Sequence, residues 1–257
     1  MTSSNDSSAT PLAHGSSLVG LIGLLGLTLL VGGSYLAAPA HTVAVAVVAA
    51  LIGLGWPHFL GIPARKTLGA VLGLSAVASV VTAAMTKAPG FLEWTPAFIA
   101  LGCMAVMLVQ LIRGTGQAAR LESTLGACAG VMLAALSAGW IANTRYNGVS
   151  EMVLVAGISA AVALLVGMIR WPDRIVAPLG VVMAALAAPL SGLVFSDLAV
   201  VPAAVTGVVV ASVLMSFRRL VSLHRGSLSV MAAIGVGLAP VAAVGALAYF
   251  IDKLLTV

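Results

Sequence analysis

Apolar runs long enough to cross a lipid bilayer recur from Leu18 onward, and they constrain this chain more than any other feature. The hydrocarbon core of a bilayer is about 30 Å thick, so a helix needs about 20 apolar residues to cross it. Hydrophobic residues make up 61% of the chain and charged residues only 7%. A soluble domain carries about a quarter of its residues as charged side chains. The sequence therefore predicts a protein whose surface faces lipid and excludes a water-soluble domain.

The apolar runs divide into nine expected transmembrane helices. They cover residues 18–38, 42–55, 67–86, 96–112, 123–141, 152–169, 175–195, 198–217 and 228–254. The second is the shortest, and it can extend to residue 62 through a kink at Pro57. The predicted fold is an all-α polytopic transmembrane bundle that forms a single domain over 18–257. Residues 1–17, rich in Ser and Thr, are expected to be a disordered cytoplasmic tail.

The distribution of basic residues predicts how the bundle is oriented. Cytoplasmic links of membrane proteins carry an excess of Lys and Arg. With the N-terminus inside, only Lys87, Arg145 and Lys253 fall outside, and the odd number of spans places the C-terminus outside. Nine basic residues then lie inside: Arg65, Lys66, Arg113, Arg120, Arg170, Arg174, Arg218, Arg219 and Arg225.

Two segments of the chain resemble one another and indicate an internal repeat. Trp56-Pro57 follows a glycine-rich stretch and precedes basic residues, and Trp171-Pro172 does the same about 115 positions later. The repeats would cover 42–143 and 151–254, with the first span as an extra helix. Four spans are an even number, so the two units would share one orientation, as in parallel transporter repeats. The alternative is chance similarity within a chain rich in Ala, Val, Leu and Gly.

The expected spans carry no ionisable residue near their middle. Such residues mark proton relays and ion pathways in membrane proteins, so transport coupled through a buried carboxylate is disfavoured. No catalytic, cofactor-binding or metal-binding residues are predicted, and we expect a protein that is not an enzyme. The alternative is an enzyme acting on envelope lipids at the outer face, where Glu93, Arg145 and Glu151 could supply an acid, a base and a binding group.

The inner links form a basic belt that is a candidate contact surface for lipid head groups or a partner protein. The high isoelectric point, about 9.8, is then a consequence of membrane topology, and no nucleic-acid partner is expected. The alternative is that these charges only set the orientation. The candidate residues are His58, Arg65, Lys66, Asp173, Arg174, Arg218, Arg219 and Arg225.

Small residues and tryptophans predict how the helices pack and where they end. Glycines four residues apart allow two helix backbones to approach closely, and the two such pairs are Gly69 with Gly73 and Gly126 with Gly130. Tryptophan is enriched at the membrane–water interface. All four tryptophans lie at expected span ends and are predicted interface anchors: Trp56, Trp94, Trp140 and Trp171.

The two cysteines lie in consecutive expected spans and are predicted not to form a disulfide. With a rise of about 1.5 Å per residue, Cys103 and Cys128 should be offset by about 10 Å along the membrane normal. They are expected to be small packing residues.

Gly55-Trp56-Pro57, Leu60-Gly61-Ile62-Pro63 and the helix that begins at Lys66-Thr67 resemble a group of multi-spanning membrane proteins of high-GC actinobacteria, loosely called permeases. The resemblance implies a bacterial plasma-membrane location and a transport role. The number of spans, the expected repeat and the prolines within the later spans favour a permease-like component for a small or lipidic substrate. The alternative is a non-catalytic subunit of a cell-envelope or transport complex. Expected partners are membrane lipids, together with another membrane protein or a second copy of the chain.

Overall fold

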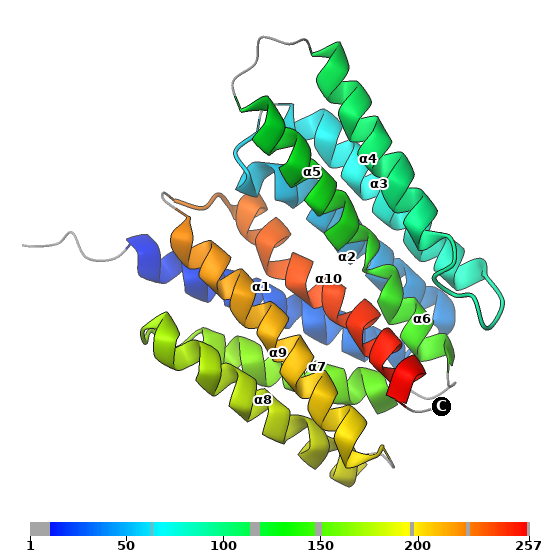
Figure 1. The fold of residues 1–257 in the computed structure, drawn as a ribbon, viewed down its shortest axis with the longest axis vertical. Coiled ribbons are helices and arrows are strands. Elements are labelled where there is room, and N and C mark those ends of the chain that lie inside the picture. The colour runs from blue at the N-terminus through cyan, green and yellow to red at the C-terminus, as the bar shows by residue number, and fades with distance from the viewer. Residues whose placement is uncertain are drawn as a thin grey trace, which may run out of the picture.

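The chain folds into a bundle of α-helices (Figure 1). The computed structural model describes residues 11–62, 64–113, 119–146, 151–195, 198–224 and 227–255, and every regular element in them is a helix. The helices are α1 (Pro11–Ser34), α2 (Ala38–Phe59), α3 (Arg65–Met85), α4 (Thr95–Ile112), α5 (Arg120–Ala135), α6 (Ala138–Tyr146), α7 (Glu151–Gly167), α8 (Asp173–Phe195), α9 (Val200–Leu223) and α10 (Val230–Leu255). This confirms the expected all-α polytopic bundle.

Each of the nine expected spans has a helical counterpart. Eight are apolar and long enough to cross a membrane, with α5 and α6 together supplying the span Arg120–Tyr146. The remaining helix, α7, has 17 residues, which is the lower limit for crossing the hydrocarbon core. The chain is therefore an integral membrane protein of the polytopic helical class.

Helices α1 and α2 are both longer than the sequence indicated. α2 begins at Ala38 and continues through Pro57 to Phe59, so the second span reaches full length. α1 begins at Pro11, seven residues before the expected start of the first span at Leu18. A proline is well tolerated in the first turn of a helix because its missing N–H has no partner there. Residues 1–10 lie outside the described part of the chain.

The fifth span is broken, whereas the sequence predicted one continuous helix. Between α5 and α6 the Ser137 N–H donates to the Ala134 carbonyl at 3.2 Å, and the Gly139 N–H donates to the Leu136 carbonyl at 3.0 Å. These bonds span three residues and form a tighter turn than an α-helix. Just after the break, a side chain at Gly139 would collide with the Ala246 backbone of α10. The break therefore lies where α6 meets the centre of the bundle.

α2 and α10 form the centre of the bundle. Figure 1 shows α3, α4 and α5 on one side of them and α7, α8 and α9 on the other. α10 is the most enclosed of the long spans, with 78% of its most hydrophobic stretch buried. It crosses α2 at Gly55 and Gly235, where a Cβ added to Gly55 would lie 2.5 Å from the Gly235 nitrogen. The two backbones are in direct contact, so no passage separates these helices at that point.

The packing of the two expected repeats differs. The first helix of the second unit, α7, packs against the two helices that follow it, α8 and α9. The first helix of the first unit, α2, packs mainly against the next helix, α3, and also against α5. An ancestral duplication therefore stays a prediction from the sequence.

Gly69 and Gly73 do allow a close approach of helices. Both face α2, and a Cβ added to Gly53 would lie 2.5 Å from the Gly73 Cα atom. Gly126 and Gly130 have a different role from the one predicted, because they make room for the side chains of Leu60 and Trp56, respectively. A side chain at Gly130 would collide with the Trp56 ring, and the Trp56 indole N–H donates to the Gly126 carbonyl at 2.9 Å.

Two of the four tryptophans are not interface anchors, which corrects the prediction. Trp56 is 4% exposed and packs against Phe59 and Phe217 inside the bundle. Trp140 is completely buried, and its indole N–H donates to the Val241 carbonyl of α10 at 3.0 Å. In both cases a neighbouring helix supplies the hydrogen-bond acceptor that an interfacial tryptophan finds in water. Trp94 and Trp171 are each 55% exposed, and their interfacial role stays a prediction.

The predicted separation of the cysteines is wrong. Cys128 on α5 and Cys103 on α4 lie close enough to interact, and both residues are free thiols. The prediction measured the depth of each cysteine from the expected end of its own helix and assumed that these ends lie at equal depths in the membrane. That assumption does not hold for α4 and α5.

Candidate functional site

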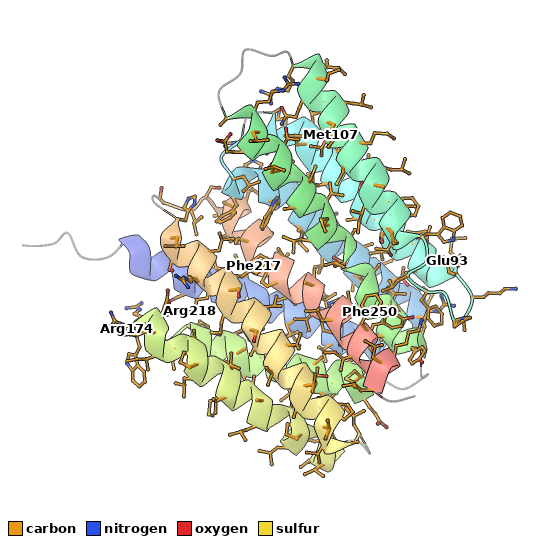
Figure 2. All side chains as sticks on the ribbon, viewed as in Figure 1. Glu93, Met107, Arg174, Phe217, Arg218 and Phe250 are labelled. Carbon is orange, nitrogen blue, oxygen red and sulfur yellow. The ribbon has the colours of Figure 1, made fainter. Side chains whose placement is uncertain are left out.

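The basic residues of the inner links gather at one end of the bundle, which we call the basic end. It comprises the α2–α3, α7–α8 and α9–α10 links, which Figure 1 shows at the same end. Arg174 and Arg218 lie there in Figure 2, and Glu93 lies at the opposite end. The candidate residues described at this end are His58, Arg65, Lys66, Asp173, Arg174, Arg218 and Arg219. Arg225 lies outside the described residues.

Arg218 is the centre of a hydrogen-bond network within the basic end. It forms an ion pair with Asp173, the first residue of α8. Its Nε donates to the Gly167 carbonyl at 2.7 Å, and its Nη2 donates to the Ile169 and Trp171 carbonyls at 3.1 and 3.3 Å. These carbonyls belong to the end of α7 and the link after it, where helical partners are missing. Arg218 therefore fastens α7, α8 and α9 together, and its donors are engaged.

The Asp173 carboxylate has a second hydrogen-bond donor, so less of its negative charge is available to other groups. The Ser222 hydroxyl donates to Asp173 Oδ2 at 3.0 Å. Ser222 lies one turn after Arg218 on α9, so both partners reach the start of α8 from the same face. The sequence analysis had not singled out Ser222, because a serine near the end of a helix carries no distinguishing pattern.

A groove of about 840 Å³ lies between α8 and α9 next to this network. Arg174 and Arg219 line its charged end, and both are exposed. Pro178, Val181 and Val182 line its apolar part on α8. Among the described residues, the guanidinium groups of Arg174 and Arg219 have no hydrogen-bond or ion-pair partner. The groove thus combines unpaired positive charge with an apolar wall.

The other candidate residues do not join this groove. Arg65 and Lys66 line a separate, shallow depression with Gly61 and Ala64. His58 bonds to the Leu54 carbonyl within its own helix through Nδ1 at 2.9 Å. The structure therefore divides the predicted basic belt into an α2–α3 part and an α8–α9 part.

A second, smaller pocket lies between α1, α7, α9 and α10, next to Arg218. Its volume is about 50 Å³, and Gly20, Leu164, Leu214 and Pro240 are among the residues that line it. A water molecule occupies about 30 Å³ in the liquid, so this cavity is far smaller than the several hundred Å³ of typical ligand sites.

At the opposite end, Arg145 has a structural role that the sequence did not indicate. Its Nη1 donates to the Ala83, Ala84 and Thr86 carbonyls at 2.8, 2.6 and 2.9 Å. The guanidinium carbon also lies 4.9 Å from the centre of the Phe91 ring. Arg145 thus caps the C-terminal end of α3, where a positive charge is favourable. It forms no ion pair with Glu93 or Glu151.

Polar atoms without partners are buried along α6 and the start of α2. Asn143 is 1% exposed and its amide nitrogen and oxygen have no hydrogen-bond partner among the described residues; the same holds for His41 Nδ1 and Ser137 Oγ. The His41 Nε2 atom faces the Trp140 carbonyl at 3.5 Å. Unpaired polar groups destabilise a protein interior. The described residues contain no group of three or more His, Cys, Asp or Glu side chains placed to hold a metal ion.

Replacing Asn143 with leucine is expected to stabilise the protein. The leucine side chain has a similar size and removes two unpaired polar atoms, so the gain should be about 1 kcal/mol, or about 2–4 °C in thermal midpoint. The measurement is size-exclusion chromatography of heated protein in detergent. Thr144→Val is the control, because the Thr144 hydroxyl already donates to the Ile141 carbonyl at 3.0 Å. A lower midpoint for Asn143→Leu would contradict the prediction.

A comparison of the chain with protein-family models, curated proteins and solved structures found no match.

Proposed function

We propose that this protein is a non-catalytic subunit of a membrane-embedded complex in a bacterial plasma membrane, oriented with its basic end in the cytoplasm. The observation that carries the proposal is the closed centre of the bundle. α2 and α10 meet backbone to backbone at Gly55 and Gly235, and the pocket between α1, α7, α9 and α10 has a volume of only about 50 Å³. A carrier needs a polar site between its repeats near the middle of the membrane.

The charged residues also support a structural role. The two arginines with the most hydrogen bonds, Arg145 and Arg218, donate to backbone carbonyls at helix ends. Arg218 uses Nε, Nη1 and Nη2 in these contacts, and Arg145 uses Nη1, which leaves fewer polar groups to recognise a small solute. The lipid-exposed helices α4 and α8 carry rows of large apolar residues; Leu101, Met104 and Leu108 on α4 are all more than half exposed.

Photo-crosslinking in native membranes tests this proposal. A benzophenone amino acid is placed at Met104 on α4 or at Leu186 on α8, both exposed. The expected result is one protein adduct of defined mass from one of these positions, identified by mass spectrometry and retained in stoichiometric amount during purification in mild detergent. The same probe at buried Val80 is the control and should give no intermolecular adduct. Lipid adducts alone from both exposed positions would refute the subunit proposal.

A permease-like role for a lipidic substrate is the second candidate, and the α8–α9 groove favours it. The groove opens on the side of the bundle and has both charged and apolar walls, as a path for a lipid requires. Protein reconstituted in liposomes with a fluorescent anionic lipid tests this role. Dithionite reduction of more than half of the label within minutes would support it, and reduction equal to that in protein-free liposomes would exclude it.

A further inference from the structure

We propose that the groove between α8 and α9 binds one anionic glycerophospholipid, with the phosphate between Arg174 and Arg219 and an acyl chain along the apolar wall. This inference goes beyond the proposed function and does not depend on it, because both a subunit and a carrier can hold a structural lipid.

The groove has a net positive charge, which favours an anionic head group. Three arginines and one carboxylate line it: Arg174, Arg218, Arg219 and Asp173. Asp173 is neutralised by its ion pair with Arg218 and by the Ser222 hydroxyl. Two positive charges remain without a partner among the described residues. A phosphate group satisfies arginine donors well, because its oxygens accept parallel hydrogen bonds.

The groove is long enough to hold part of an acyl chain as well as a phosphate. The α8 wall covers nine residues from Arg174 to Val182, and the α9 wall covers eight from Arg219 to Ser212. At about 1.5 Å per residue, the groove extends about 10–12 Å from its charged end into the apolar zone. That is about a third of the thickness of the hydrocarbon core. A free phosphate would fill only the charged end, whereas a lipid fills both parts.

The polar groups within the groove fit the glycerol region of a lipid. Pro178 has no N–H, so the Arg174 carbonyl four residues earlier lacks its usual helical donor. The Ser212 and Ser216 hydroxyls donate to carbonyls of their own helix at 2.7 Å, which leaves their oxygens able to accept. Ser216 lies about one turn from Arg219 on α9, and Ser212 lies one turn farther along the α9 wall. These acceptors suit a lipid whose head group carries hydroxyl donors, such as phosphatidylglycerol.

The groove also opens toward the region that lipid occupies. Val182, Met183 and Leu186 on α8 are exposed, at 55%, 45% and 57%. An unfilled space beside these residues would lose dispersion contacts on one side, so an acyl chain enters it. The arginines then select for anionic lipids, each contributing about 1 kcal/mol near a membrane surface.

The test uses the full chain in nanodiscs of phosphatidylcholine with increasing fractions of phosphatidylglycerol, and native mass spectrometry reads the retained lipid. Wild-type protein is expected to retain one phosphatidylglycerol. Arg174→Gln with Arg219→Gln should weaken retention about 30-fold, which corresponds to two contributions of about 1 kcal/mol each. Arg65→Gln with Lys66→Gln is the matched control, because it removes the same charge from the same end but outside the groove. Equal weakening in both double variants would overturn the proposal.

A second pair of variants separates lipid loss from misfolding. Ser216→Trp fills the groove without changing charge and should abolish retention, whereas Val205→Trp, on an exposed part of α9 outside the groove, should not. All variants are first checked for a single elution peak and unchanged helical circular dichroism. Retention by Ser216→Trp, displacement of the lipid by inorganic phosphate, or a second copy of the chain crosslinked through the groove would each overturn the proposal.

Discussion

Replacing Gly55 with leucine is expected to prevent α2 and α10 from packing, with a loss of more than about 3 kcal/mol in folding free energy. A Cβ on Gly55 would lie 2.5 Å from both the Gly235 nitrogen and the Met231 carbonyl oxygen. These are backbone atoms, so no rotamer change can make room. Overpacking of a core costs about 1–3 kcal/mol even when side chains can shift, and here a whole helix must move.

The thermal midpoint should fall by about 10 °C or more, and much of the protein should elute as aggregate in detergent. Gly235→Leu should behave in the same way, because the contact is reciprocal. Gly32→Leu is the matched control, since nothing lies within 4 Å of a Cβ at that position. It should change stability by less than about 1 kcal/mol, with a small gain from helix propensity. A small effect at Gly55 would mean that α2 and α10 are not in contact.

Replacing Arg218 with methionine is expected to loosen the α7–α8 link and cost about 2–3 kcal/mol. The change removes the ion pair with Asp173 and the hydrogen bonds to the Gly167, Ile169 and Trp171 carbonyls. Hydrogen bonds of charged groups contribute about 1.5–3 kcal/mol each when buried. The Arg218 and Asp173 side chains are 18% and 38% exposed, so water replaces part of what is lost.

Hydrogen–deuterium exchange of the peptide over residues 164–176 is the direct measurement, because exchange there should rise before the rest of the protein unfolds. Arg219→Met is the control. Arg219 is the next residue along the chain, but its guanidinium has no intramolecular partner among the described residues. The comparison is made in neutral detergent without anionic lipid, so that only intramolecular contacts count. Similar exchange in both variants would contradict the role assigned to Arg218.

The sequence was sufficient to place the helices because length and apolarity decide where a chain crosses a membrane. It also placed the basic residues, since alternating spans return every second link to the same end. It misplaced Trp56 and Trp140, because a tryptophan at a span end has the same neighbours in sequence whether it faces lipid or another helix. The accommodating glycine at position 130 is on a different helix from Trp56, and no local pattern connects them.

Contacts between distant helices could not be predicted for the same reason. The glycines at 55 and 235 meet only because α10 enters the centre of the bundle, and 28 glycines offer many other pairings. The shared depth of Cys103 and Cys128 depends on an axial shift between α4 and α5 that apolar length does not determine. The α8–α9 groove likewise depends on how the side chains of two helices pack, so the sequence could name Arg174 and Arg219 but not show that they line one space.

The central position of α10 has a consequence for biogenesis. A ribosome synthesises α1 to α9 before α10, so these helices enter the membrane while the centre of the bundle is still missing. The faces of α1, α2, α6, α7 and α9 that later contact α10 must therefore stay in lipid, or in the insertion machinery, until α10 arrives. Assembly of this protein is consequently a late, concerted event, and the interval before α10 inserts is when quality-control proteases can recognise it.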